Sequence, residues 1–458
     1  MEEVRRAERP GVIVAVHGYP PTFGGGAERR AERTARGLLK RGYRVAVLCV
    51  ESAATSRPGA PWEDTTQDGV LVRRLSFDAR AARDRFRMSY ANPLVKTALQ
   101  DLIQAWHPSL VHLFSGYLLT ASVIHAARAA NLPTIVTLTD YWWLCHQITL
   151  IRTDGSRCDG PSIPACTRCH AETFRRYRLT AQQWPEGAAA FWKLAERSPT
   201  LGRMVGATQQ RQRRATLLAA LGQTDALIAP SQYLARYYLH AGVDAAKLRV
   251  WRQGVDARGA LPRRPSDTLR FGYLGQIKSH KGIDVLLAAW GRLRGTRPRQ
   301  LVLYGSDVGE AEYGQRIRQS IAEIEGVTWP GEFGAGGPWA ALSDMDVLVV
   351  PSRWAENSPN SILEARAAHV PVVGSDLGGV AEMVKHDEDG LLFQVDDPAD
   401  LARQLQRLLD EPALAERLRE RTPPVQSVDD EIDQICTLYQ EILERHGTVA
   451  QLALDGAP

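Results

Sequence analysis

The sequence predicts an α/β protein built from two doubly wound domains, each a parallel sheet covered by helices on both faces. Short apolar runs alternate with amphipathic helical stretches through both halves of the chain. This alternation is typical of parallel sheets that are buried on both sides. Between the two series lie residues 256–268, which hold two prolines and several charges but no periodicity, so we place a linker there.

Length and composition agree with this prediction and exclude some classes of protein. A chain of 458 residues is long enough for two or three domains. Hydrophobic residues make up 44% and charged residues 24%, and we find neither an apolar run that could span a bilayer nor a basic-then-apolar leader. We therefore expect a cytoplasmic location. A formal net charge of +4 without a recurring basic and aromatic module argues against nucleic acid as a partner.

The first domain is predicted over residues 1–255, with a cysteine-rich insertion at 141–221. The predicted strands are 12–18, 44–50, 70–77, 110–115, 134–138, 226–230 and 248–251. The predicted helices are 27–39, 93–106, 118–130 and 233–240.

The second domain is predicted over residues 269–425, followed by a final helix and tail at 426–458. Its predicted strands are 269–275, 300–305, 327–333, 346–352, 370–376 and 391–395. One predicted helix begins at Ile283, another ends near Glu325, a third lies near Trp339 and a fourth begins at Val380. Further helices are predicted over 400–421. The last amphipathic helix, 429–445, closes the core of one of the two domains, and the sequence does not say which. Ligands of such sheets bind beyond the carboxyl ends of the strands, which makes the cleft between the domains the expected site.

One strand-to-helix corner, SRWAENSPNSILEARAAHVPVV from Ser352, carries two glutamates on either side of its turn. Ser358 is the expected N-cap and Pro359 the expected first helical residue. Free backbone N–H groups are then expected at Asn360, Ser361 and Ile362. A helix start of this kind holds a phosphate, while Glu364, one turn beyond Asn360, accepts hydrogen bonds from a ribose or a sugar.

Glycine-containing corners follow several other predicted strands. Gly24, Gly25 and Gly26 open the helix of the first domain, where they serve either as a ligand-binding turn or simply as a tight turn. In the second domain, Gly275 ends a strand and Lys281 precedes a helix, so that Lys281 either neutralises a diphosphate or is a solvated lysine at a helix end. Two further corners contain Gly305 and the pair Gly378–Gly379.

In chain order, these corners read GGGAE, GYLGQIKSHKGID, LVLYG, ENSPNSILE and PVVGSDLGGVAEMV. Together they resemble the successive signatures of GT4-type retaining glycosyltransferases, and the resemblance extends from about Val12 to Phe393. It implies the GT-B fold, in which two Rossmann-like domains face an interdomain cleft. It also implies a nucleotide-diphosphate sugar donor, such as a UDP-, GDP- or dTDP-sugar, and a hydroxyl-bearing acceptor.

The resemblance also assigns roles to residues of this sequence. Glu356 would contact the donor sugar, Glu364 the ribose and Lys281 the diphosphate. Backbone groups beside the diphosphate would come from Asn360, Ser361 and Ile362, and further donor contacts from the corners at Gly25, Gly26, Gly275 and Gly305. No catalytic divalent metal is required, because the lysine and the helix start stabilise the leaving group.

The sequence departs from the family pattern at two places. Gln276 follows Gly275 where the family commonly has arginine, and Lys278 is then the nearby source of the missing charge. Thr139 precedes Asp140 where the family commonly has histidine before aspartate. Asp140 therefore either orients or deprotonates the acceptor hydroxyl or caps the next helix.

The expected function is transfer of a hexose, with retention, in glycan, glycolipid or natural-product assembly. The departures at Gln276 and Thr139 leave open a nucleotide-sugar-binding or assembly protein without efficient turnover. A nucleotide-sugar epimerase or a glycosyl phosphorylase of the same architecture is a further alternative, although neither accounts for the ordered set of corners as well.

Four cysteines fall within the insertion, at Cys145, Cys158, Cys166 and Cys169, the last two as C-x2-C. This spacing suits a structural zinc ion held by thiolates. An iron–sulfur cluster uses the same ligands, and His146 or His170 can replace one thiolate. Disulfides or unpaired thiols are the remaining alternatives.

The segment after the cysteines, residues 174–221, mixes aromatic residues with many arginines. It either rests on an anionic membrane or grips an acceptor phosphate, or else it forms helices that pack on the N-terminal sheet. The membrane alternative would place the protein at the inner face of the membrane as a peripheral partner.

Overall fold

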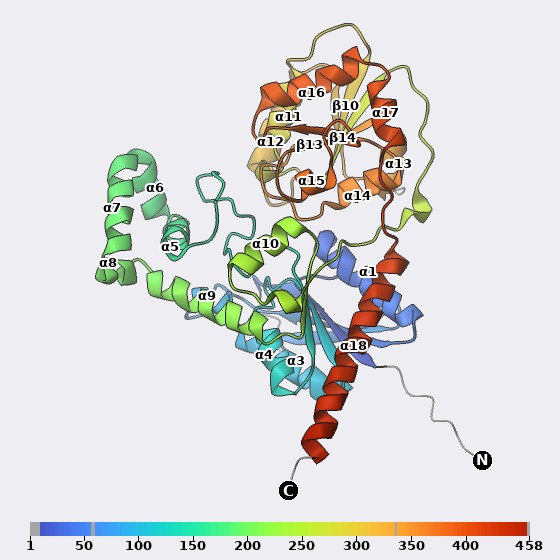
Figure 1. Ribbon diagram of the computed structural model, residues 1–458. Coiled ribbons are helices and arrows are strands. Elements are labelled where there is room, and N and C mark those ends of the chain that lie inside the picture. The colour runs from blue at the N-terminus through green and yellow to red at the C-terminus, as the bar shows by residue number, and fades with distance from the viewer. Residues whose placement is uncertain (1–9, 56–59, 335–336, 456–458) are drawn as a thin grey trace, which may run out of the picture. The chain divides into compact units, whose positions relative to one another are not determined.

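The computed structural model describes residues 10–55, 60–334 and 337–455. The chain divides into two compact α/β units (Figure 1). The first consists of Met1–Pro230, Ala235–Trp251 and Asp429–Pro458, and the second of Ser231–Leu234 and Arg252–Val428.

The first unit contains an eight-stranded sheet in the order β3-β4-β2-β1-β5-β6-β7-β8. The strands are β1 (Gly11–Val16), β2 (Arg44–Ser52), β3 (Trp62–Gln67), β4 (Val70–Ser76), β5 (Leu110–Phe114), β6 (Thr134–Thr137), β7 (Ala226–Ala229) and β8 (Leu248–Val250). All neighbouring strands are parallel except β3, which runs antiparallel to β4 at one edge. Strand β3 was not predicted because WEDTTQ has no apolar run, which is common in an exposed edge strand.

Helices cover this sheet and form the insertion. They are α1 (Gly26–Lys40), α2 (Arg85–Met88), α3 (Pro93–Trp106), α4 (Ser122–Ala129), α5 (Ile163–Ala171), α6 (Arg175–Gln183), α7 (Pro185–Arg197), α8 (Pro199–Met204), α9 (Ala207–Gly222), α10 (Gln232–His240), the short η1 (Ala245–Lys247) and α18 (Val428–Asp455). Helix α4 begins later than predicted because Leu118 and Thr120 adopt left-handed backbone angles, with φ of 60° and 63°.

The last helix, α18, belongs to the first unit, which answers the question that the sequence left open. Arg30 on α1 donates to Glu431 on α18 at 2.7 Å, and both side chains are buried. The Tyr439 hydroxyl lies 2.7 Å from Nδ1 of His112 on β5. The end of the chain therefore packs against elements near its beginning.

The second unit contains a six-stranded, fully parallel sheet in the order β11-β10-β9-β12-β13-β14. The strands are β9 (Leu269–Leu274), β10 (Arg299–Tyr304), β11 (Val327–Gly331), β12 (Val347–Val350), β13 (Val372–Ser375) and β14 (Gly390–Phe393). The helical segments are η2 (Ala257–Gly259), η3 (Ser279–Lys281), α11 (Ile283–Trp290), α12 (Ala311–Ala322), α13 (Gly337–Ser343), α14 (Asn360–Ala367), α15 (Gly378–Met383), α16 (Pro398–Asp410) and α17 (Leu414–Glu420).

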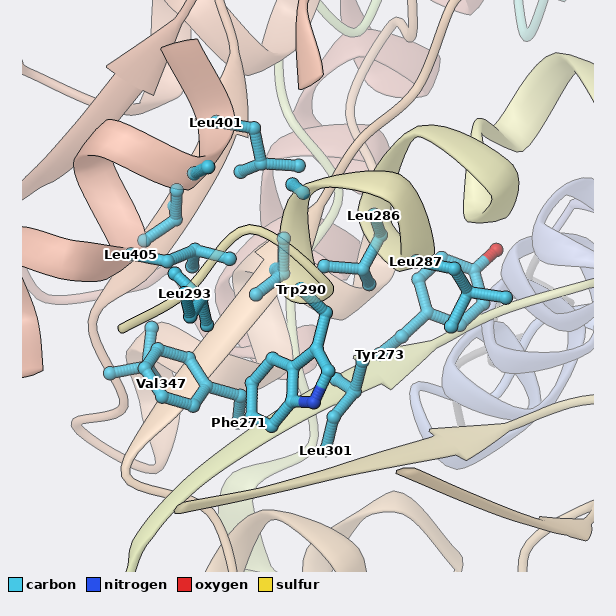
Figure 2. Close-up of a cluster of buried hydrophobic side chains, with 14 of the residues drawn as sticks. Phe271, Tyr273, Leu286, Leu287, Trp290, Leu293, Leu301, Val347, Leu401 and Leu405 are labelled. Atoms are coloured by element: carbon cyan, nitrogen blue, oxygen red, sulfur yellow. The ribbon is translucent and has the colours of Figure 1, made fainter. Parts of the chain in front are cut away.

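One face of this sheet is buried under α11 and α16 (Figure 2). Phe271 and Leu301 from the strands meet Trp290 and Leu405 from the helices, all of them buried. The Trp290 indole N–H donates to the Glu325 carbonyl at 3.1 Å, so its polar atom is satisfied. This packing positions β9 and β12, and the chain continues from their carboxyl ends to Lys281 and Glu356. No helix in the described ranges is long and apolar enough to cross a membrane.

Candidate functional site

The order of strands in the second unit creates a topological switch point between β9 and β12. From β9 the chain continues to β10 and β11 on one side, and from β12 to β13 and β14 on the other. The two crossovers therefore leave in opposite directions, which opens a crevice at the carboxyl ends of β9 and β12. Lys281 follows β9 and Glu356 follows β12, so both lie at this position.

Lys281 and Glu356 form an ion pair at the switch point. The Lys281 ammonium donates to Oε1 of Glu356 at 2.6 Å, and the Ser352 hydroxyl donates to the same oxygen at 2.8 Å. Glu356 is buried. Burial alone would raise the pKa of Glu356, but the Lys281 charge and these hydrogen bonds outweigh burial and hold the pKa below its usual value. Glu356 is therefore ionised at neutral pH, and the Lys281 Nζ lies 5.1 Å from the centre of the Trp354 ring.

The start of α14 differs by one residue from the prediction. The N-cap is Pro359 rather than Ser358, and no side chain caps this helix. The N–H of Ile362 already donates to the Pro359 carbonyl at 3.1 Å, so Ile362 was wrongly expected to offer a free N–H. Ile362 is instead part of the core, while Asn360 and Ser361 begin the helix and are only half-buried. Glu364 lies one turn further along, also half-buried.

Two residues that the sequence analysis missed hold this corner in place. Gln253 donates from its amide to the Ser358 carbonyl at 2.7 Å and to Oδ1 of Asn360 at 2.9 Å. Arg353 forms a bidentate pair with Asp284, with both distances 2.8 Å, and so ties the Glu356 loop to the start of α11. Gln253 lies outside every corner that the sequence indicated, and Arg353 lies inside one but pairs with a residue 69 positions away, which local sequence does not reveal.

The glycines of these corners allow backbone segments to approach each other closely. Gly305 has a φ of +154°, and a Cβ added there would lie 1.7 Å from the Gly275 carbonyl oxygen. Gly282, with a φ of +72°, would place a Cβ 2.0 Å from the carbonyl oxygen of Pro351. The turn after β9 is thus held against the ends of both β10 and β12.

The two polar residues after Gly275 have different surroundings. Gln276 is exposed, and its backbone carbonyl accepts from the Tyr273 hydroxyl at 2.7 Å. Lys278 is half-buried beside the turn that leads to Lys281. Burial, together with the neighbouring Lys281 charge, lowers the pKa of His280 to about 4, so this imidazole is neutral at pH 7.

Two buried polar atoms near the Glu356 loop have no hydrogen-bond partner within the described residues. These atoms are Oγ of Ser358 and Oε1 of Gln253. An unsatisfied buried donor or acceptor costs about 1–3 kcal/mol, so such a cluster fits a site that receives a polar ligand.

In the first unit, the switch point lies between β1 and β5, and polar residues again follow the strands. Asp140, two residues beyond the predicted strand, accepts from the Trp142 N–H at 2.8 Å and from the hydroxyls of Ser115 and Thr139, both at 3.1 Å. Burial raises the pKa of Asp140 above its usual value, more than these hydrogen bonds and the nearby His17 lower it. Its bond to Trp142 resembles a turn cap, but its raised pKa also suits a carboxylate that accepts a proton.

His17, which the sequence analysis did not single out, pairs with Glu28 near this carboxylate. Nε2 of His17 lies 3.2 Å from Oε1 of Glu28, while Nδ1 of His17 is buried without a partner in the described part of the chain. A Cβ on Gly25 would lie 2.6 Å from the Glu28 carboxylate, so this glycine makes room for Glu28. Gly26 is the first residue of α1. Glu28 therefore supplies a negative charge in the first turn of α1, where the helix dipole favours one.

The four cysteines of the insertion come together, as their spacing suggested, and line one small pocket with His146. All four are free, so the disulfide alternative is not realised. Burial raises the pKa of Cys166 to about 12 and of Cys169 to about 11, which favours protonated thiols. The Cys158 thiol donates to the Gly160 carbonyl at 3.3 Å.

Across the residues that the structure describes, no group of three or more potential ligands is arranged to hold a metal ion. The predicted zinc centre and its iron–sulfur alternative therefore find no support.

Two parallel-sheet units with polar corners at their switch points are typical of nucleotide-binding α/β enzymes. Comparisons with known proteins narrow this class. Residues 24–258 match the family described as Glycosyltransferase Family 4, and residues 268–411 match the Glycosyl transferases group 1 family. The chain belongs to the group 1 glycosyltransferases of family 4.

Individual relatives extend over most of the chain. The chain is 25% identical over 403 residues to a glycogen synthase of Mycobacterium tuberculosis, and the alignment covers 87% of this chain and 86% of the relative. The chain is 29% identical over 440 residues to a D-inositol 3-phosphate glycosyltransferase of Stackebrandtia nassauensis, and this alignment covers 90% of this chain and 86% of the relative.

Solved structures show the same fold. HepE of Anabaena, in complex with UDP and glucose, superimposes with a TM-score of 0.61 at 17% identity, covering 96% of this chain and all of that one. The sucrose-phosphate synthase of Thermosynechococcus elongatus gives a TM-score of 0.61 at 19% identity, covering 98% and 100%. The fold is therefore GT-B, as the sequence predicted.

Proposed function

We propose that this glycosyltransferase moves a hexose from a nucleotide-diphosphate sugar to a hydroxyl acceptor, with retention of the anomeric configuration. The observation that carries the proposal is the Lys281–Glu356 pair at the switch point of the second unit, beside the start of α14. It combines a cation and helix N–H groups for a diphosphate with a buried carboxylate for sugar hydroxyls.

The chemistry follows from where charge develops in the reaction. Breaking the bond between the anomeric carbon and the diphosphate builds positive charge on the sugar and negative charge on the leaving group. Lys281 and the N–H groups of Asn360 and Ser361 would stabilise the leaving group, and Glu364 would hold the ribose. In this proposal Gly275, Gln276, Lys278 and Gly305 contribute further contacts to the donor.

On the acceptor side, Asp140 would accept a hydrogen bond from the attacking hydroxyl and orient it. For retention, the acceptor approaches from the face that the nucleotide leaves, so the departing phosphate can itself take the proton. Gly25 and Gly26 would serve this reaction by positioning Glu28 and the start of α1. The acceptor class remains glycan, lipid-linked or small-molecule.

The donor can be identified by thermal stabilisation. Since a ligand that binds only the folded state raises stability by mass action, UDP-, GDP- and dTDP-sugars should be compared with their free nucleotides. The UDP complex of the similar HepE makes UDP-glucose the first candidate. A rise in Tm with one donor class identifies the nucleotide.

Turnover decides between a transferase and a binding protein. We expect wild-type protein to release the nucleoside diphosphate in the presence of an acceptor, and Glu356→Ala to lose this activity by about a hundredfold or more. Glu323→Ala, an exposed glutamate of the same unit, is the matched control. Donor binding without nucleotide release would support the binding-protein alternative, and a product of inverted configuration, seen by NMR, would exclude retention.

A further inference from the structure

Large apolar side chains are exposed mainly in one short part of the first unit. Ten such side chains are exposed in the described ranges, and six of them fall within residues 174–204. These six are Phe174, Leu179, Trp184, Phe191, Leu194 and Met204. We call residues 174–204, which include α6, α7 and α8, the helical hairpin. Exposed apolar side chains that gather in this way usually mark an interaction surface.

In the described part of the chain, the hairpin packs on other helices rather than on the sheet of its own unit. Helices α6, α7 and α8 pack mainly on one another and on α5 and α9, and α9 connects them to α4 (Figure 1). The alternative that this segment consists of helices packed on the N-terminal sheet is therefore wrong for the hairpin. Among the described residues, the six large apolar side chains of this segment therefore stay exposed.

Helix α7 carries the most regular part of this surface. Phe191 and Leu194 are one turn apart and lie on the same face, with Trp184 two turns before Phe191 at the N-cap. The Trp184 side chain is 66% exposed, although its ring lies over Gly187, where an added Cβ would come within 2.2 Å. An indole fixed at a helix start and still largely exposed suits an interface between water and lipid.

The hairpin is also strongly basic. It contains six basic residues and only two acidic ones, so its excess of four positive charges equals the formal net charge of +4 of the whole chain. The exposed arginines Arg175, Arg176 and Arg178 occupy one end of α6. Within the residues described, no ion pair is formed by any of the six basic side chains, while Arg168 outside the hairpin does pair with a glutamate. These charges are available to an anionic partner.

We propose that the helical hairpin is a docking surface for an anionic lipid bilayer. Aromatic and aliphatic side chains enter the headgroup region, and unpaired arginines interact with the negative surface. A bilayer is favoured over an acidic protein because the exposed apolar side chains come from three helices and alternate in sequence with basic ones, and lipid, unlike a folded partner, adapts to such an irregular surface. This inference does not depend on which sugar the site transfers.

Vesicle sedimentation with the full-length protein tests the proposal. Vesicles of phosphatidylcholine alone are compared with vesicles in which about a third of the lipid is phosphatidylglycerol, at roughly 0.1 M salt and again at several times that concentration. We expect binding to the anionic vesicles that weakens with salt. Replacing Arg175, Arg176 and Arg178 by glutamine should weaken binding about fivefold for each arginine removed.

The apolar contribution is tested by Trp184→Ala combined with Leu194→Ala, which should lower binding at least tenfold. Leu261→Ala with Val308→Ala is the control, because both side chains are exposed but lie outside the hairpin. Circular dichroism confirms that all variants are folded. Equal binding of the hairpin and control variants, or no binding to anionic vesicles, would overturn the proposal. Self-association in sedimentation velocity that the hairpin variants abolish would instead identify a second copy of the chain as the occupant.

Discussion

At the level of single residues, the charge balance between Lys281 and Glu356 gives the sharpest prediction. Lys281→Gln leaves a buried carboxylate without its cation, so we expect nucleotide release to fall by about a hundredfold or more. The matched control is Lys385→Gln, whose side chain is 73% exposed and which should keep full activity. Equal activity in Lys281→Gln and wild type would remove this lysine from the leaving-group site.

The same pair predicts a dependence of stability on pH. The folded-state pKa of Glu356 is below its unfolded value, so the stabilisation by this pair is present above the unfolded pKa, about 4.3, and is lost as the pH falls through the lower, folded value. Lys281→Gln should therefore be less stable than wild type at pH 7, and the difference should narrow as the pH is lowered past this window. Urea unfolding at several pH values measures it.

The pKa of Asp140 is shifted in the opposite direction, above its usual value. Because burial raises its pKa, the ionised form is lost at a higher pH than for an ordinary aspartate, so the acid limb of the transfer rate should lie above its usual position. We expect Asp140→Asn to lower the rate of transfer by about a hundredfold with little change in donor affinity. A pH–rate profile and donor titration measure both quantities, and an unchanged acid limb in Asp140→Asn would assign that limb to another group.

At the level of elements, the sequence predicted the strand-end corners well because each depends on local chemistry. Glycines, the lysine after β9 and the glutamate after β12 can be read from neighbouring residues. The partners of these corners could not be predicted in this way. Gln253 reaches Asn360 across 107 positions of the chain, and the His17–Glu28 pair joins the end of β1 to α1. The first contact depends on how distant segments of the chain fold together, and the second on the path of the loop between β1 and α1, and periodicity reveals neither.

The turn between β9 and α11 allows an element-level prediction. Gly282→Ala combines a left-handed backbone with a contact of 2.0 Å to the Pro351 carbonyl oxygen, so we expect a loss of about 3 kcal/mol in the free energy of unfolding. Gly295→Ala separates the two causes, because its φ of +93° is also left-handed but nothing lies within 4 Å. It should cost only about 1 kcal/mol. Equal losses would show that backbone strain alone matters at Gly282.

At the level of the whole molecule, the first unit can be understood only with residues from a distant part of the sequence. The sequence predicted two doubly wound sheets from alternation alone, but it did not assign α18. The reason is physical: an amphipathic helix shows that one face is buried without showing against what. In the structure, α18 packs against α1 and β5, so the first unit is completed only by the last helix of the chain.

This packing makes a substitution in α1 sensitive to α18. Glycine to alanine inside a helix normally stabilises by about 0.5–1 kcal/mol, and Gly447→Ala inside α18, with nothing within 4 Å, should follow that rule. At Gly37 an added Cβ would lie 2.6 Å from Cγ1 of Ile432 on α18, so we expect Gly37→Ala to destabilise by about 1–3 kcal/mol. Repeating Gly37→Ala in an Ile432→Ala background should remove most of that loss, as urea unfolding of the four variants would measure. If the loss persists without the Ile432 side chain, the contact between the two ends of the chain is not its cause.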